Sequence, residues 1–311
     1  MQAKALKRGA YPAMITPYTA DNKIDYPAVE RLLRWYEKEN CAGVLAICAS
    51  SEIELLSLEE RIELAHFCVE HKGNLTMVVC GHCSDDFEEQ VIEMNAMAAA
   101  KPDALCFIVS HVNEPGLDDD GFIANTKRLM DAIEDKEIPL GFYEWPGGGE
   151  RRRFLNEKIL KWCADTGRFV FVKETSCQSA AIKAKIDAVK GTNLGIYNAN
   201  SSLLYQSLLD GAAGFCGIMA NYHGYPYQWL CDNFEKHPKE AALVSDLIGA
   251  LSQTTSGYPA SAKLYQKKYG AYMEPYSRRF KLNMSEEDEY RLGQVHNVVT
   301  YLREKLEELD K

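Results

Sequence analysis

The sequence has no stretch that is long and apolar enough to cross a membrane, since no window approaches the roughly 18 uninterrupted apolar residues of a spanning helix. Its first residues, Met1 to Gly9, also lack the apolar segment of a secretion signal. Positive charge is in deficit, because 35 Lys and Arg residues stand against 45 Asp and Glu residues, for a formal net charge of −10. These absences predict a soluble cytoplasmic protein that binds neither nucleic acid nor membrane surfaces.

Concentrated basic runs and paired metal-ligand spacings are scarce as well. Arg151 to Arg153 form the one basic run, and it is interpreted as a solvated loop or helix start. Among ten cysteines, Cys80 and Cys83 form a single CxxC without a second pair at zinc spacing. Structure or chance is the favoured interpretation of this pair, and a redox dithiol is the alternative. The other cysteines lie mostly in apolar runs, as reduced core residues do.

What the sequence does contain is an alternation of short apolar runs and amphipathic stretches. Eight strands are predicted at 11–16, 43–48, 76–80, 104–109, 139–143, 168–173, 194–197 and 214–219. Helices are predicted near 26–40, 57–72, 85–100, 119–135, 155–165, 178–190 and 201–210. This α/β pattern matches a (β/α)8 TIM barrel. A doubly wound sheet is the alternative, but the chain has no phosphate-binding glycine fingerprint.

Two parts of the chain are distinguished by this pattern. Residues 1–221 are predicted to form the barrel that carries the active site. Residues 222–311 show no comparable strands and are predicted to be a C-terminal helical extension packed on the barrel, with a last helix near 284–308. The extension is also a candidate for an oligomer interface.

Lys173 has an unusual place among the polar residues. It closes the apolar run from Phe169 to Val172, and polar residues follow it. The carboxyl end of a barrel strand is where this fold gathers its reactive groups. An amine that is removed from water loses its proton more easily and can attack carbonyl carbon. The alternative is a strand-edge lysine whose head group reaches back to water.

Three polar segments are predicted to meet at the carboxyl ends of strands. They are Cys48-Ala49-Ser50-Ser51-Glu52, Tyr143-Glu144-Trp145-Pro146 and Lys173-Glu174-Thr175-Ser176. Together they offer hydroxyl and amide donors, a phenol and an amine. This set suits an α-keto acid, because the amine can attack the ketone while the donors hold the carboxylate and the phenol moves protons.

At these positions the chain resembles the dihydrodipicolinate synthase / N-acetylneuraminate lyase family of class I, Schiff-base-forming aldolases. The likeness covers essentially the whole chain and is carried by Ala13-Met14-Ile15-Thr16-Pro17-Tyr18, Ser50-Ser51-Glu52, Tyr143 with Pro146, Val172-Lys173-Glu174, and Gly214-Phe215-Cys216-Gly217 with Ala220-Asn221. The resemblance implies a homodimer or homotetramer. It also implies chemistry without a metal or organic cofactor, because the protonated imine itself accepts the electrons of the carbanion.

The resemblance assigns a role to each matching residue. Lys173 would form the imine and Tyr143 would relay protons, although a strand-end tyrosine with its hydroxyl on water is the alternative. Ser50, Ser51 and Cys216 would bind the substrate, and Ser50 would hold the carboxylate of the keto acid. For both serines, capping of the next helix is an open alternative. Glu144 and Glu174 are interpreted as solvated or supporting carboxylates. His111 and Asn113 are interpreted as rim positions that could contact substrate, with a structural role as the alternative for His111.

Three departures from the synthase branch bear on the substrate. A relay hydroxyl would fall at Ala49, a tyrosine donated across a subunit interface at Val112, and a substrate-binding arginine at Gly148. Their loss argues against dihydrodipicolinate synthesis. Gly147 to Gly149 imply a mobile or closely approached loop, into which one of Arg151–Arg153 could swing as a carboxylate partner.

The expected function is a lyase that joins Lys173 to pyruvate or a related α-keto acid in a Schiff base. It would then cleave, condense or dehydrate an aldehyde or sugar-acid-like partner. A non-catalytic keto-acid-binding or regulatory protein of the same fold is the alternative, suggested by Ala49 and Val112. The sequence leaves open the second substrate, the direction of reaction, and the choice between aldolase and dehydratase.

Overall fold

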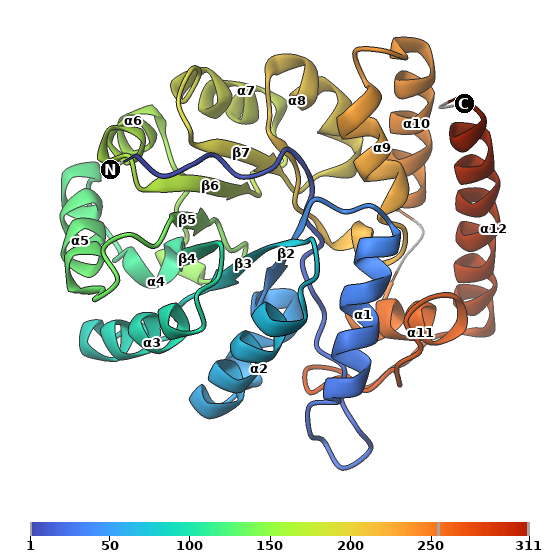
Figure 1. Cartoon of the computed structure of the whole chain (residues 1–311), viewed down its shortest axis with the longest axis horizontal. Helices are drawn as coiled ribbons and strands as arrows, with labels where there is room; N and C mark the ends of the chain where they lie inside the picture. Colours follow the sequence, from blue (N-terminus) through green and yellow to red (C-terminus); the bar gives the residue numbers. More distant parts are fainter. Residues whose placement is uncertain (1, 254–255, 310–311) are drawn as a thin grey trace.

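The computed structural model describes residues 2–253 and 256–309. Its centre is a sheet of eight parallel strands in the order β1-β8-β7-β6-β5-β4-β3-β2, surrounded by helices (Figure 1). The strands are β1 (Gly9–Ala10), β2 (Gly43–Ala46), β3 (Thr76–Cys80), β4 (Ala104–Ile108), β5 (Leu140–Tyr143), β6 (Phe169–Glu174), β7 (Gly195–Asn198) and β8 (Gly214–Phe215). Hydrogen bonds from Met14 N to Leu45 O (2.9 Å) and from Leu45 N to Pro12 O (3.0 Å) join the two edges. The predicted TIM barrel is confirmed.

The first and last strands are shorter than the sequence predicted. β1 ends at Ala10 instead of spanning 11–16, and beyond it only Ala13 pairs in the ladder, with Leu45. Pro12 has no N–H to donate, which explains why the regular pairing stops there. β8 ends at Phe215 instead of residue 219, because the chain turns into a short 3-10 helix at Ile218–Asn221.

The helices of the barrel follow the strands as predicted. They are α1 (Tyr26–Lys38), α2 (Leu58–His71), α3 (Phe87–Ala99), α5 (Asp119–Ala132), α6 (Glu157–Thr166), α7 (Ser179–Ala188) and α8 (Leu204–Asp210), with the single turn α4 (Val109–Val112) after β4. The capping box of α2 is present, since Glu60 N donates to Ser57 Oγ at 3.1 Å and Ser57 N donates to Glu60 Oε2 at 3.0 Å. α3 is capped by Asp86, which accepts from Glu89 N.

The described part of 222–311 contains four helices. α9 (Tyr225–Asn233) contacts β1 and β8, so it takes the place of the eighth outer helix of the barrel. α10 (Pro238–Leu251) and α12 (Glu286–Leu309) pack against α9, and they lie with α11 (Ala260–Tyr269) on one side of the barrel (Figure 1). Over the described residues, every helix is too short or too polar to cross a membrane.

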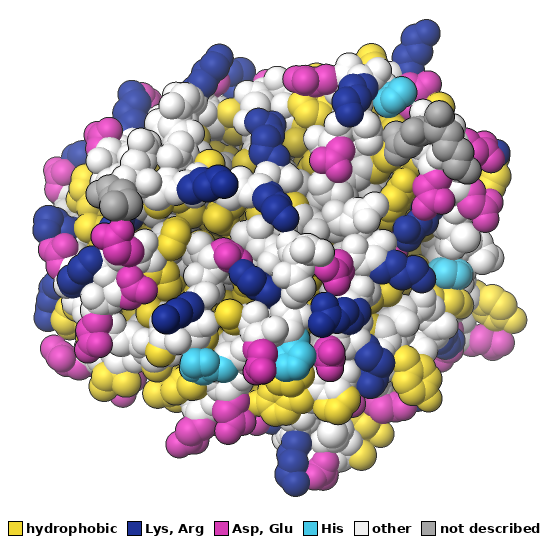
Figure 2. Space-filling model, in the orientation of Figure 1, with side chains coloured by type: hydrophobic (Ala, Val, Ile, Leu, Met, Phe, Trp, Pro, Cys, Tyr) yellow, Lys and Arg dark blue, Asp and Glu magenta, His cyan; other side chains and the backbone are white. Residues whose placement is uncertain are grey.

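Large aromatic rings fill the amino-terminal half of the barrel. Tyr11, Phe171 and Tyr197 contact one another, with ring centroids 4.5 to 5.7 Å apart. The phenols of Tyr11 and Tyr197 both donate to Lys7 O, at 2.9 and 3.0 Å. These rings fill the interior at the amino-terminal end of the barrel. On the outer face shown in Figure 2, side chains of both charge signs are interspersed.

Candidate active site

Lys173 and Tyr143 lie side by side inside the carboxyl end of the barrel. They are register partners on β6 and β5, and each residue is only 3% exposed. Lys173 Nζ lies 4.4 Å from the centroid of the Tyr143 ring. A lysine that reached back to water would be exposed, so the interpretation of Lys173 as a solvated strand-edge residue is wrong. Two of the predicted site residues are therefore in contact, at the end of the barrel where this fold builds its active sites.

The Tyr143 phenol is in a setting that keeps it protonated. Burial raises the pKa of Tyr143 well above its usual value, and the buried neighbours Cys48, Cys80 and Cys216 act in the same direction. A phenol that holds its proton at neutral pH can donate it to a leaving hydroxyl.

Cys216 lies at the end of β8 and is completely buried. Burial raises the pKa of its thiol to about 12, while the positive charge of Lys173 acts in the opposite direction. The positive charge of Lys173 also acts to lower the pKa of the Cys80 and Cys106 thiols, against the larger effect of burial. The Lys173 charge thus acts on three buried thiols, and a substrate contact of Cys216 stays a prediction.

The redox interpretation of Cys80 and Cys83 finds no support in their surroundings. All ten cysteines are free of disulfides. Burial raises the pKa of the Cys80 thiol well above its usual value and that of Cys83 to about 11. An activated dithiol needs a lowered pKa, so these two thiols lack the property that a redox role requires.

Ser50 and Ser51 lie in the short turn after β2, Ala49–Ser51. Ser51 Oγ donates to Met14 O at 2.6 Å and accepts from Cys48 N at 3.2 Å, so this hydroxyl joins the segment after β1 to the turn after β2. Ser50 is 5% exposed, and its side chain hydrogen-bonds to the phenol of Tyr258. Of the two serines, Ser50 is the one whose hydroxyl faces other groups at the mouth of the barrel.

Tyr258 was missed by sequence reasoning, because it belongs to the extension. Its hydroxyl accepts from Asn221 Nδ2 at 3.1 Å and lies 3.5 Å from Ala13 O. Burial raises the pKa of this phenol well above its usual value, and Tyr258 in turn contributes to the raised pKa of Tyr143. The turn signal Gly257-Tyr258-Pro259 inside an otherwise helical segment is the sequence feature that could have directed attention to it.

The extension also holds the loop after β2. Lys263 Nζ of α11 lies 2.6 Å from Glu52 Oε1, and both residues are completely buried. Burial lowers the pKa of Lys263 to about 8, against the opposing effect of Glu52. Arg279 Nη2 donates to Ala49 O at 3.1 Å and pairs with Glu54. The segment that follows Lys263 in the chain therefore forms one wall of the barrel mouth.

Two carboxylates that were interpreted as solvated are buried. Glu144 is 1% and Glu174 0% exposed, and both bind the ammonium group of Lys185. The interpretation as solvated groups is wrong, because the strand carries these side chains toward the covering helices and not toward water. Their role as supporting residues fits this position.

The rim residues after β4 are committed to contacts within the chain. His111 Nδ1 lies 2.7 Å from Asp85 Oδ1, and Asn113 Nδ2 donates to Arg151 O at 2.9 Å. Arg151 Nε donates to Ser110 O at 3.0 Å, and Arg153 Nη1 lies 2.7 Å from Asp119 Oδ1. Arg151 and Arg153 are therefore partly buried and paired, so the prediction of a solvated loop or helix start holds only for the exposed Arg152.

Other residues approach the glycine loop closely at Gly148, which is one of the two properties predicted for this loop. A Cβ added to Gly148 would lie 2.6 Å from Ser110 Cβ, and Gly148 has a φ of +93°. Only glycine fits both conditions without strain. At the other departures, Ala49 offers no hydroxyl and Val112 is buried with 4% exposure.

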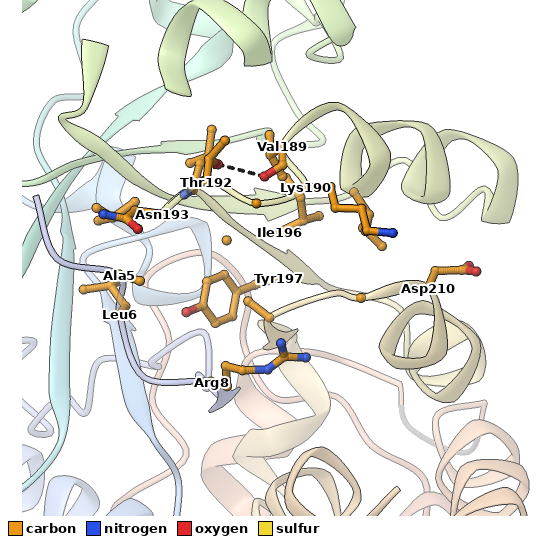
Figure 3. A pocket seen from close by; sticks show the side chains of 17 residues that line it. Ala5, Leu6, Arg8, Val189, Lys190, Thr192, Asn193, Ile196, Tyr197 and Asp210 are labelled. Carbon is orange, nitrogen blue, oxygen red and sulfur yellow. Dashed lines mark hydrogen bonds between the residues drawn. The ribbon is translucent and has the colours of Figure 1, made fainter. Parts of the chain in front are cut away.

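A separate cavity of about 330 Å³ lies at the opposite end of the barrel (Figure 3). It is lined by the amino-terminal segment with Arg8 and by the residues before β7, with Asp210 at its margin. The Arg8 guanidinium already donates to Ala212 O at 2.7 Å. Aromatic rings inside the barrel separate this cavity from Lys173, so it is distinct from the candidate site at the carboxyl end.

Comparisons with known proteins find relatives along nearly the whole chain. A family model described as the dihydrodipicolinate synthetase family matches residues 6–296. The 4-hydroxy-tetrahydrodipicolinate synthase of Psychrobacter sp. is 23% identical over 220 residues, which cover 70% of each chain. YagE, an E. coli K12 prophage protein of the dihydrodipicolinic acid synthase family solved with pyruvate, gives a TM-score of 0.81 at 19% identity, over 96% of this chain and 99% of that chain. The Acinetobacter baumannii dihydrodipicolinate synthase complexed with pyruvate gives 0.81 and 19%, over 94% and 99%.

Proposed function

Because the chain belongs to the dihydrodipicolinate synthetase family, we propose that it is a class I aldolase-type lyase in which Lys173 forms a Schiff base with pyruvate or a related α-keto acid. The observation that carries the proposal is the buried Lys173 amine against the protonated Tyr143 phenol. The pyruvate named in the YagE and A. baumannii structures supports this choice of keto acid.

The proposed reaction uses groups that the barrel brings together. The Lys173 amine adds to the ketone carbon and forms a carbinolamine, whose hydroxyl leaves as water when Tyr143 supplies a proton. The resulting iminium draws electrons from the neighbouring carbon, so a C–C or C–O bond at that position can form or break. Ser50 would hold the carboxylate of the keto acid from the opposite side of the barrel mouth.

The second substrate is proposed to be an aldehyde or a sugar acid, not the partner used in dihydrodipicolinate synthesis. Ala49, Val112 and Gly148 stand where that activity would place polar groups, and none of them can donate a side-chain hydrogen bond. Whether the product is made by aldol chemistry or by dehydration is decided by product identification across a panel of aldehydes and sugar acids.

Borohydride trapping tests the proposal directly. Incubation with pyruvate and borohydride should reduce the imine and leave a stable adduct on the peptide that contains Lys173. Lys173→Ala should give no adduct and lose at least about 10³-fold in turnover, while keeping its fold. A wild-type protein that stays unmodified under saturating pyruvate would remove the proposal.

A non-catalytic keto-acid binder is the second candidate, because Ala49 and Val112 leave the site without two hydroxyl groups. Calorimetry combined with a turnover screen separates the two functions, since a binder would take up the keto acid and turn over no member of the panel. The Tyr258 hydroxyl beside Ser50 supports the enzyme, because it restores a phenol to the barrel mouth.

We further propose that the protein is a homodimer or homotetramer and that it works in a reducing compartment such as the cytoplasm. Ten cysteines without a disulfide support the compartment. Analytical ultracentrifugation measures the oligomeric state.

A further inference from the structure

Each of the two reactive residues is followed directly by a buried carboxylate. Glu144 comes after Tyr143, and Glu174 comes after Lys173. Neighbouring residues of a strand face opposite sides of the sheet. Since Tyr143 and Lys173 face into the barrel, the two carboxylates face outward, toward the covering helices. The proposed chemistry uses neither of them.

One ammonium group bridges these two carboxylates. Lys185 of α7 is 4% exposed, and its Nζ lies 2.6 and 2.7 Å from the two oxygens of Glu144 and 2.9 Å from Glu174 Oε1. Glu144 follows the last residue of β5, with its N–H donating to Lys173 O at 3.2 Å, and Glu174 is the last residue of β6. Lys185 therefore joins the two strands directly behind the Tyr143–Lys173 pair.

Backbone groups complete the network. The Glu144 carboxylate also accepts from Leu155 N at 2.8 Å and from Thr175 N at 3.2 Å, and Glu174 Oε1 accepts from Ser176 N at 2.9 Å. Burial raises the pKa of Glu144, and Lys185 opposes this effect. Two carboxylates and one ammonium group leave a formal charge of −1 among buried residues. Without Lys185 the two buried carboxylates would face each other without a compensating charge.

We propose that Lys185 is a positioning residue: it fixes β5 against β6 at their carboxyl ends and thereby holds the Lys173 amine at the Tyr143 phenol. This inference rests on the proposed function. Apolar side chains could pack α7 onto the barrel without the cost of desolvating three charged groups. What they could not supply is a directional tie to the residue after Tyr143 and the residue after Lys173. A misplacement of reacting groups by about 1 Å can cost about 10²-fold in rate.

The test compares rates of borohydride trapping of the Lys173–pyruvate imine over a range of pyruvate concentrations. In Lys185→Met we expect the maximal trapping rate to fall about 10²-fold, with the half-saturating pyruvate concentration unchanged. The half-saturating concentration should stay the same because the carboxylate of pyruvate is proposed to bind at the loop after β2. Three strands separate β2 from β6 in either direction around the barrel, so the loss of Lys185 should not disturb that loop. Lys185→Arg keeps the charge and the donors, so it should recover most of the rate.

Lys183→Met is the matched control on the same helix. Lys183 Nζ lies 2.6 Å from Asp187 Oδ2, but both side chains are about half exposed, at 52% and 54%. This variant should trap pyruvate like the wild type. If Lys185→Met does not fold, the charge-free variant Lys185→Met/Glu144→Gln/Glu174→Gln leaves no buried charge uncompensated while it still lacks the tie, and the same loss of rate is expected.

The outcomes separate the two proposals. If the wild type traps pyruvate and the folded Lys185→Met variant, or the charge-free variant, traps it at the same rate, the role of Lys185 is overturned. The proposed function then still stands. An equal loss in Lys183→Met would also overturn it, because the effect would not depend on the bridge. Absence of any adduct in the wild type would overturn the proposed function and this inference with it.

Discussion

Lys263 of α11 joins the helical extension to the loop that is proposed to hold the substrate carboxylate. Its ammonium lies 2.6 Å from Glu52 Oε1 and 2.7 Å from Tyr276 O, and both members of the ion pair are completely buried. Glu52 follows Ser50 and Ser51 directly and has a left-handed backbone, with a φ of 63°. Replacement of Lys263 by methionine therefore perturbs stability and the carboxylate loop together.

The magnitude follows from what Glu52 keeps when Lys263 is gone. Removal of one partner from a buried ion pair costs about 3–5 kcal/mol, because the other charge stays buried without compensation. Glu52 Oε2 still accepts from Ser277 Oγ at 2.8 Å and from Arg279 N at 2.8 Å. These remaining bonds stabilise the carboxylate, so we expect Lys263→Met to lower the free energy of unfolding by about 3 kcal/mol, the lower end of that range.

Urea unfolding measures this loss as a shift of the midpoint at constant slope. Lys267→Met is the control, one turn further along α11, where Lys267 Nζ lies 2.7 Å from Glu274 Oε2 with side chains 37% and 41% exposed. An exposed pair of this kind is worth at most about 1 kcal/mol. The double variant Lys263→Met/Glu52→Gln should regain part of the loss, since no buried charge is left alone. Equal losses in Lys263→Met and Lys267→Met would refute the reasoning.

Two further predictions concern buried titratable groups and the phenols. Burial lowers the pKa of His82 and His223 to about 3, so below about pH 6.5 the unfolded chain binds protons that the folded chain does not, and stability should fall by up to about 1.4 kcal/mol per pH unit for each histidine. Urea unfolding at pH 7 and pH 5 checks this, and equal stability at both would contradict it. Tyr143→Phe should lower kcat by about 10²–10⁴-fold through loss of the proton donor, whereas Tyr258→Phe should raise KM for the keto acid about tenfold through loss of the hydrogen bond to Ser50. Steady-state kinetics that showed the reverse pattern would exchange the roles of the two phenols.

The sequence predicted the barrel and the meeting of Lys173 with Tyr143 because both depend on the pattern of the strands. Lys173 is recognisable as a polar end to an apolar run, and the parallel strand order then brings it beside Tyr143. Strand ends were less accurate where one residue changed the backbone, as Pro12 does after β1. A pattern of apolar positions predicts which face of an element is buried, and it carries no information on which polar group that face will meet.

The partners of buried charges illustrate this limit. Glu144 was interpreted as a solvated or supporting carboxylate without a named partner, and its partner Lys185 lies 41 residues further along the chain. Glu52 and Lys263 are separated by 211 residues. Lys185 lies in the helix predicted at 178–190 and Lys263 in the predicted helical extension, and the sequence pattern singled out neither lysine. Only the closed barrel and the docked extension bring these lysines to the carboxylates, so the pairs follow from tertiary packing and not from local sequence.

The character of the barrel interior changes between successive layers of side chains. Phe171 and Lys173 face the same side of β6, two residues apart, and the lower layer that contains Phe171 is filled by stacked aromatic rings. Around Lys173 the neighbours are instead thiols such as Cys106 and Cys216. A thiol behaves as a small apolar group that can be buried without a hydrogen-bond partner, which a serine hydroxyl at the same place could not do without cost. The groups of this layer are therefore small and apolar as well as buried. In such surroundings the attraction between an iminium and the net negative charge of the Glu144–Lys185–Glu174 network is screened less than it would be in water.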